Sequence, residues 1–214
     1  MSACVYCEKD KGKRSCPALG GLISAKCCGQ HRGIEIDCPV TCHYYREGEE
    51  HIRARLAPDF HQSWLKAVAP LYHERRAQLL DWVITLEITT YSYFSQYSRG
   101  TDEDLIEALT YLKNKLSPIA IIESPGNALG KHLVNRTKAF FESGQGIDAD
   151  EGQEGIELLL GVINAQLSEE SPRHALHGLL GHVEQVIGVP ENLDEHNEDD
   201  RPAKSNIILP GGGN

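Results

Sequence analysis

The chain has 214 residues and a formal net charge of −10, with 21 Lys and Arg against 31 Asp and Glu. Its hydrophobic content of 40% and charged content of 24% are ordinary for a globular protein. No apolar run approaches the roughly 18 residues that span a bilayer, and the N-terminus lacks the apolar core of a secretory signal. We therefore expect a cytoplasmic protein without a membrane-spanning segment.

The first 46 residues differ from the rest of the chain because they contain all seven cysteines. The odd number argues against a scaffold of disulfides alone, and clustered cysteines in a reducing compartment more often bind metal. This segment is too short and too polar to fold by burial, so it needs a cross-link such as a metal ion. We predict a cysteine-rich zinc module over residues 1–46, with candidate ligands Cys4, Cys7, Cys16, Cys27, Cys28, Cys38 and Cys42.

Two closely spaced pairs within this module are typical zinc ligands. Cys4 and Cys7 are separated by two residues, and Cys38 and Cys42 by three, at the expected start of a helix. Two such pairs can close one tetrahedral zinc site, which leaves the other three cysteines for a second ion or as spectators. An iron–sulfur cluster is the less favoured alternative, because the tight repeated spacing of such clusters is absent.

Charge is distributed unevenly between the module and the rest of the chain. Residues 1–46 carry seven Lys and Arg against four Asp and Glu, whereas the remainder carries 14 against 27. A basic module could bind nucleic acid, although bound thiolates would offset its positive excess. The basic residues that would make this contact are Lys9, Lys11, Lys13, Arg14, Lys26 and Arg32.

Helical periodicity begins near residue 58 and predicts a helix that ends at Pro70. The following segment, from Leu71, predicts a long helix that ends near Gly100. Its second half, 82–98, is rich in β-branched and aromatic residues, so a strand there is the alternative.

Four further helices are predicted beyond this point. Thr101 and Asp104 form a capping-box-like start for a helix that stops before Pro118. Helices from about Ala128 and around 156–167 follow, and the last is expected to use Ser171 and Pro172 as N-cap and N1. The fold class is therefore mainly α: a small zinc module on a bundle of about five or six helices over residues 50–190. An acidic tail over 191–214 ends in a short apolar segment.

Two further groups of titratable residues lie in the helical part. Glu87 stands in an apolar, aromatic-rich segment, where such a residue more often pairs with a partner than acts as a base. His174, His177 and His182 do not converge at helical spacing, so we interpret them as exposed or capping residues rather than as metal ligands.

The cysteine-rich segment resembles the N-terminal region of a family of uncharacterised bacterial proteins. That region reads approximately C-x2-C…K-x2-R-x-C-P-A…I-C-x2-C-C-G-x2-R-x2-E-I-x-C-P-x2-C-x-Y. The segment is more loosely similar to interleaved two-zinc fingers of the HIT and MYND type. The matching residues are Cys4, Cys7, Cys16, Pro17, Ala18, Ile23, Cys27, Cys28, Gly29, Arg32, Glu35, Ile36, Cys38, Pro39, Cys42 and Tyr44.

The resemblance implies a zinc module on a helical domain, but it brings no established activity. An interleaved arrangement would place Cys4, Cys7, Cys27 and Cys28 at one site. Cys16, Cys38 and Cys42 would share the other with a histidine, His31 ahead of His43. Ser24 stands where the family has Cys, so Cys28 or His31 is expected to supply the missing ligand.

The sequence favours a non-enzymatic, zinc-stabilised interaction or adaptor protein with a protein partner. Nucleic-acid binding through the basic module and a thiol-based redox or metal-responsive role are the alternatives. The number of zinc ions, one or two, and the formation of a homo-oligomer stay open.

Overall fold

The computed structural model describes residues 2–96, 99–117, 125–142 and 147–188. This part of the chain is mainly helical, as the sequence predicts. The acidic tail expected over 191–214 lies outside the described residues. Among the described residues, no helix combines the length and the apolar character that crossing a bilayer requires.

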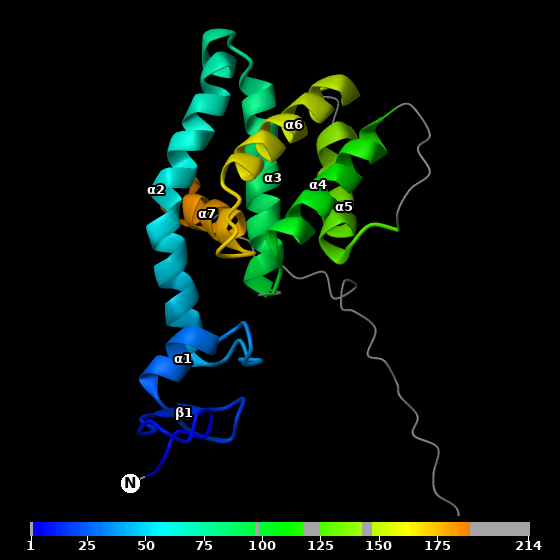
Figure 1. Ribbon diagram of the computed structural model, residues 1–214. Coiled ribbons are helices and arrows are strands. Elements are labelled where there is room, and N and C mark those ends of the chain that lie inside the picture. Colours follow the sequence, from blue (N-terminus) through cyan, green and yellow to red (C-terminus); the bar gives the residue numbers. More distant parts are fainter. Residues whose placement is uncertain (1, 97–98, 118–124, 143–146, 189–214) are drawn as a thin grey trace, which may run out of the picture.

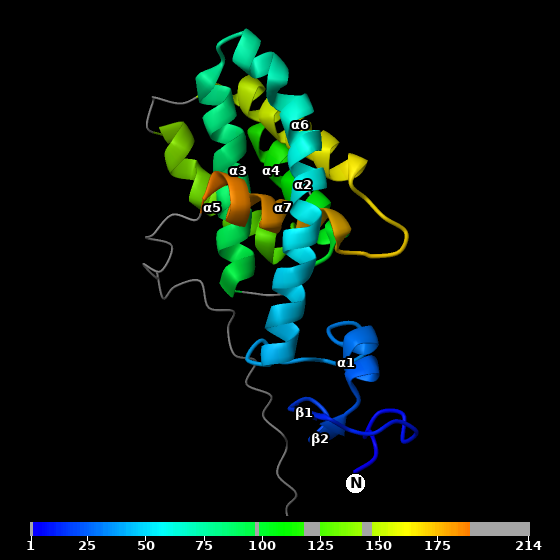
Figure 2. The ribbon, with the colours of Figure 1, turned by 90° about the vertical axis from the view of Figure 1, so that its left-hand side faces the viewer.

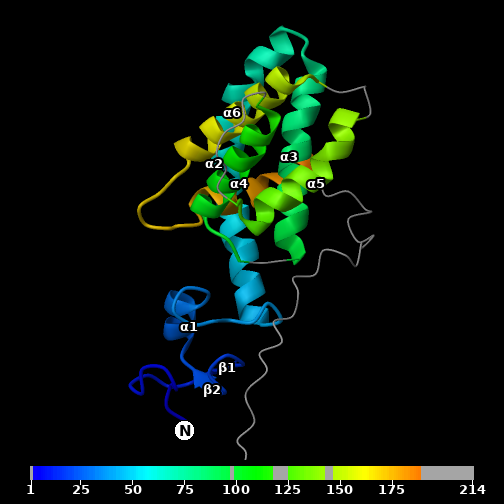
Figure 3. The same ribbon diagram turned by 90° about the vertical axis from the view of Figure 1, so that its right-hand side faces the viewer.

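The cysteine-rich region contains one small sheet and one short helix. Strands β1 (Arg14–Cys16) and β2 (Gly21–Ile23) pair antiparallel, with Ser15 opposite Leu22. Helix α1 (Ala25–His31) follows directly and is capped by Ser24. In all three views this region lies beyond one end of the helical bundle (Figure 1, Figure 2 and Figure 3).

Helix α2 (His43–His73) begins directly after Cys42 and continues along the bundle (Figure 1). The predicted helix end at Pro70 is wrong, because both Pro58 and Pro70 lie inside α2. Both prolines are on the exposed side of the helix. A stripe at helical spacing stays buried on the other side, and its burial outweighs the two lost backbone hydrogen bonds. The buried stripe is Ala57, Phe60, Trp64, Val68 and Leu71.

The bundle is completed by six further helical segments. They are α3 (Ala77–Gln96), α4 (Asp102–Leu116), α5 (Ala128–Glu142), α6 (Ala149–Ala165), α7 (His174–His182) and the π-helix η1 (Val183–Ile187). Figure 2 shows α7 crossing α2, and Figure 1 shows α4 and α5 on the side of α3 that faces away from α2. The helical interpretation of segment 82–98 is confirmed as far as Gln96, and the strand alternative is wrong over that stretch.

The two predicted helix starts have different outcomes. The capping box of Thr101 and Asp104 is confirmed, with both reciprocal hydrogen bonds present. The prediction for the last helix is wrong, because α7 begins at His174, after an N-cap at Arg173 that has no side-chain hydrogen bond. The carboxylate of Asp102 accepts from the backbone N–H groups of Ala175 and Leu176 at 3.3 and 2.8 Å. A residue of α4 therefore supplies the cap that Ser171 was expected to give.

Candidate metal centre

Three cysteines from two separate segments converge in the N-terminal region. The Sγ atoms of Cys4, Cys7 and Cys27 all lie within 4.8 Å of one another. None of the seven cysteines forms a disulfide. Tetrahedral zinc with sulfur ligands at about 2.3 Å holds neighbouring sulfur atoms roughly 3.8 Å apart, so this spacing fits one metal ion.

The local backbone explains why Cys4 and Cys7 point the same way. Cys4 N–H donates to the Asp10 carbonyl, Glu8 N–H donates to the Cys4 carbonyl, each at 2.8 Å, and Glu8 has a φ of 58°. This tight loop brings the Cys4 and Cys7 sulfurs close to each other. Burial opposes ionisation of Cys4, but the backbone amides of Cys7, Ser24 and Tyr6 and the Ser24 hydroxyl outweigh it, and its pKa falls to about 6. The loop is therefore built to hold a thiolate.

Cys27 reaches the same point from the first turn of α1. Its backbone N–H donates to the hydroxyl of Ser24 at 3.1 Å, while the Ser24 N–H donates to the Cys4 sulfur at 3.2 Å. The Ser24 hydroxyl favours the Cys27 thiolate, but burial and the neighbouring Cys7 and Cys4 outweigh it and raise the pKa of Cys27. Without a cation, a second thiolate next to Cys4 is thus disfavoured.

Ser24 lies beside the three-cysteine group. Its side chain is 4% exposed and lowers the pKa of both Cys4 and Cys27, so the hydroxyl lies beside both sulfurs. Ser24 therefore presents an oxygen atom, rather than a fourth sulfur, to the group. A hydroxyl is a weaker zinc ligand than a thiolate, since zinc in structural sites is held mostly by Cys and His.

A second group of buried cysteines lies next to the first. Burial raises the pKa of Cys38, the backbone of Gly33 partly opposes this, and negative charge on Cys42, Cys16 or Cys28 raises it further. Each of these four thiols is at most 8% exposed. Among the described residues they do not converge as closely as the first three.

The structure places Cys28 differently from the interleaved assignment, which put it with Cys4, Cys7 and Cys27. Cys28 is not one of the three converging residues, and it lies close enough to Cys38 for a negative charge on it to raise the pKa of Cys38. Successive residues of a helix point about 100° apart, so Cys27 and Cys28 of α1 face different groups.

The two histidines considered as ligands have other partners. His31 Nδ1 lies 3.0 Å from Glu35, and its ring stacks on Tyr6 with centroids 4.5 Å apart. His43 Nε2 lies 3.2 Å from Glu47 on the exposed start of α2. His31 is therefore beside the first group, but its described contacts are with a carboxylate and a ring.

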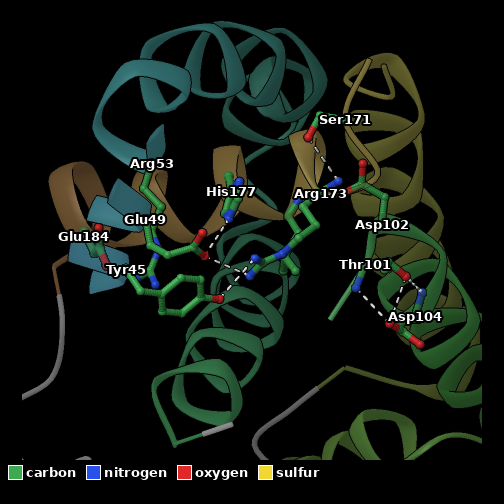
Figure 4. Close-up of polar contacts among 11 residues, drawn as sticks. Tyr45, Glu49, Arg53, Thr101, Asp102, Asp104, Ser171, Arg173, His177 and Glu184 are labelled. Atoms are coloured by element: carbon green, nitrogen blue, oxygen red, sulfur yellow. Dashed lines mark hydrogen bonds and ion pairs between the residues drawn. The ribbon is translucent and has the colours of Figure 1, made fainter. Parts of the chain in front are cut away.

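A polar layer between α2 and α7 links the cysteine-rich region to the bundle (Figure 4). Glu49 accepts contacts from Arg173 at 2.9 Å and from His177 at 3.0 Å, and Arg173 also donates to the Tyr45 hydroxyl at 3.4 Å. Burial opposes ionisation of Glu49, but His177, Arg173 and Arg53 outweigh it and lower its pKa. Tyr45 packs with the buried cysteines, so this layer joins them to α7.

The sequence does not predict this layer, because helical spacing alone indicates that His177 and His182 are exposed or capping residues. That interpretation is wrong, because the two residues are 4% and 0% exposed and each pairs with a buried glutamate. The signal that could have indicated part of it is the spacing of Tyr45, Glu49 and Arg53, which share one face of a helix.

Comparisons with known proteins give no relative for this arrangement. No family model matches the chain, and the searches of curated proteins and of solved structures give no significant match.

Proposed function

We propose that the protein is a non-enzymatic interaction protein, in which zinc folds the cysteine-rich region and the residues beside the metal contact a protein partner. One observation carries this proposal: large apolar side chains of the cysteine-rich region face solvent. Val5 is 45% exposed, Leu19 41% and Leu22 38%. A short segment that leaves such residues uncovered gains stability from its cross-link rather than from burial.

Val5 and Leu22 are held next to each other by the backbone, and we call them the Val5–Leu22 patch. Val5 N–H donates to the Leu22 carbonyl at 2.9 Å. Val5 also packs on Gly21, where an added Cβ would come within 2.4 Å of its Cγ1 atom. Val5 lies between two of the converging cysteines, so metal binding there fixes the position of the patch.

Zinc is the metal that we propose, with a structural role. Thiolates at these spacings suit a structural zinc site, and the pKa of Cys4 is already low enough for it to be a thiolate at neutral pH. The second cysteine group is the candidate for a second zinc ion. The resemblance to the bacterial family and the cytoplasmic location belong to the same proposal.

Two alternative functions are less well supported. For nucleic-acid binding, Lys9, Lys11, Lys13 and Lys26 are exposed, but the other two basic residues have internal partners. Arg14 lies over the Tyr44 ring at 4.5 Å, and Arg32 donates to the Tyr44 carbonyl at 2.9 Å. For a redox role, release of metal by mild peroxide would be required.

The proposal is tested by introducing charge into the patch without changing the cysteines. Native mass spectrometry with elemental analysis should find zinc in the wild type and in the double variant Val5→Asp, Leu22→Asp. A protein captured by the wild type is then purified and titrated against both. We expect the double variant to lose at least about tenfold in affinity, or about 1.4 kcal/mol.

Ile34→Asp is the matched control, because Ile34 is 81% exposed in the same region but outside the patch. It should bind as the wild type does. Equal binding by the double variant, or protein isolated with seven unmodified thiols and no metal, contradicts the proposal. Steep salt dependence with a nucleic acid instead would favour the alternative.

A further inference from the structure

A pocket of about 680 Å³ lies between α2, α3 and the C-terminal turns of the bundle. This volume is within the range of small-molecule sites in proteins. Its walls are largely apolar or aromatic, chiefly Trp64, Leu65, Tyr72, Ile84, Ile88 and Val186. Three of these side chains are exposed at its rim: Leu65 by 44%, Tyr72 by 57% and Val186 by 49%. The pocket is therefore apolar and open to solvent.

A chain of three polar side chains leads from the buried interior to this pocket. Glu87 Oε1 lies 3.2 Å from His182 Nδ1, and His182 Nε2 lies 3.2 Å from His61 Nδ1. Glu87 and His182 are each 0% exposed, whereas His61 is half-buried. Both histidines line the pocket. A carboxylate buried at this depth is thus connected to the pocket through two imidazoles.

The polar groups at the inner end of the chain are incompletely satisfied. Glu87 Oε2 and Trp64 Nε1 make no hydrogen bond of good geometry within the part of the chain that the structure describes, although the Trp64 indole is close enough to favour the ionised Glu87. Buried polar atoms are nearly always paired in native proteins, so an unpaired carboxylate oxygen requires an explanation. Glu87 thus keeps unused hydrogen-bonding capacity behind the pocket.

The backbone beside the pocket is also unusual. His182 is followed by the π-helix η1, which ends at Gly188 with a φ of 86°. Single turns of π-helix occur frequently at functional sites. The turn brings Val186, Ile187 and Gly188 to the pocket wall.

The order of the three hydrogen-bonded side chains determines which kind of ligand group they can bind. An ionised Glu87 only accepts hydrogen bonds, so His182 presents Nδ1–H to it and keeps a lone pair on Nε2. His61 then donates Nδ1–H to that lone pair and keeps its own lone pair on Nε2. The three side chains therefore present an acceptor, His61 Nε2, to a ligand that donates a hydrogen bond.

The charges around the pocket favour a cation over an anion. No Lys or Arg is among the described residues that line it. Arg53 of α2 and Glu184 of η1 pair with each other at 2.7 Å and so add no net charge. The faces of Trp64 and Tyr72 attract cations, whereas a carboxylate ligand would meet no fixed positive charge.

We propose that this pocket binds a small organic amine with an apolar chain. The ammonium group donates to His61 Nε2 beside the aromatic rings, and the apolar chain lies against Ile84, Ile88 and Val186. The ionised Glu87 provides the compensating charge through His182. The site is separate from the cysteine groups, so it does not depend on the proposed zinc-stabilised function.

Binding of an amine has a defined dependence on pH. Burial raises the pKa of Glu87, against the opposing effects of His182 and of the nearby Trp64 indole. Burial and the charge of His182 lower the pKa of His61. A bound ammonium favours the ionised Glu87 and the neutral His61, so its affinity rises with pH over the range in which these two groups lose their protons.

The test uses three probes of equal chain length on the full, metal-loaded protein: hexylammonium, hexanol and hexanoate. Binding is followed by the ¹⁵N shifts of the histidine rings. We expect saturable binding of hexylammonium that shifts His61 and His182, at least fivefold weaker binding of hexanol, and no saturation with hexanoate.

Variants locate the binding in this pocket. Glu87→Gln should weaken hexylammonium at least fivefold and remove much of the rise with pH, whereas Asp81→Asn, an exposed carboxylate on the same helix, should not. Tyr72→Ala removes an exposed ring with little risk to folding, and it should weaken hexylammonium more than hexanol. Hexanoate binding as tightly as the amine, no saturable binding of any probe, or binding that none of these variants changes overturns the proposal.

Discussion

The cysteine-rich region and the helical bundle bury different kinds of side chain. The buried cluster of the N-terminal region consists of six cysteines with Ile23, Ile36 and Tyr45. The bundle buries a continuous apolar core that includes Phe60, Trp82 and Leu109, each 0% exposed. Five of the nine exposed large apolar side chains in the described residues belong to the first 46 residues. The small region thus depends on thiols where the bundle depends on area removed from water.

The two regions therefore respond differently to the same treatment. Metal ligation contributes about 10–16 kcal/mol in small zinc-folded peptides, which exceeds what a few buried apolar residues supply. The bundle, in contrast, is sensitive to volume and to buried charge.

Removal of metal is expected to have the largest effect. A strong chelator should unfold the segment from Cys4 to Cys42, because uncompensated thiolates repel and the apolar residues there are exposed. Helices α3 to α7 should persist, since their core contains no cysteine. Hydrogen exchange measured by mass spectrometry resolves the two regions. Retained protection around α1 in metal-free protein would show that the thiols act as ordinary core residues.

Glu49→Gln should destabilise the bundle by about 3 kcal/mol near neutral pH, because it removes the buried carboxylate that Arg173 and His177 both contact. The lowered pKa of Glu49 gives the sign of the pH dependence. Stability from its ionised form is present above the unfolded pKa of about 4.3 and is lost as pH falls through the lower folded value. The difference between variant and wild type in urea unfolding should therefore shrink below about pH 4.

Glu50→Gln is the control for this variant, because Glu50 is the exposed neighbour on α2. Its free energy of unfolding should stay close to the wild-type value. A Glu49→Gln difference that grows in acid would contradict the described pairing.

Gly181→Ala should cost about 2 kcal/mol, since a Cβ there would come within 2.3 Å of the Arg53 carbonyl oxygen on α2. Gly161→Ala on the exposed side of α6 meets no neighbour within 4 Å and should stabilise by about 0.5–1 kcal/mol. Thermal unfolding measures both changes, and the zinc content should be the same in the two variants. Loss of zinc in Gly181→Ala would show that the regions are more tightly coupled than their contacts indicate.

Ser24→Cys should change the free energy by less than Glu49→Gln or Gly181→Ala does. A thiol beside Cys4 and Cys27 would complete a four-sulfur set, and we expect about tenfold slower loss of zinc to a chelator, which corresponds to about 1.4 kcal/mol. Ser24→Ala removes the cap of α1 and should lose zinc faster than the wild type. Identical rates in all three proteins would place Ser24 outside the metal site.

The helices can be predicted from the sequence where residues close together in the chain determine them. Periodic leucines and the pair of Thr101 and Asp104 predict α4 without reference to the rest of the chain. The helix end predicted at Pro70 is wrong, because proline disfavours a helix only locally. The burial of Phe60 and Leu71, which keeps α2 continuous, depends on distant segments. The cap of α7 by Asp102 has the same origin, because the two segments lie far apart in the sequence.

The candidate site was predictable in its residue types but not in its grouping. Cysteine spacing indicates metal ligands, and the 100° turn between Cys27 and Cys28 could have separated them. The pairing of Glu87 with His182 could not be read from periodicity, because it joins residues 95 positions apart. Long-range contacts of this kind also account for the polar layer around Glu49.

The extensive packing of α2 against α7 has a consequence for biosynthesis. Roughly 100 residues separate the end of α2 from the start of α7, so at ribosomal rates about 5–20 s pass before the second helix emerges. During that interval the Phe60 side of α2 lacks its main cover, while the cysteine segment has already left the ribosome and can take up metal. The nascent chain therefore exposes the apolar side of α2 during this interval. This is the stage at which binding by a chaperone would protect the chain from aggregation.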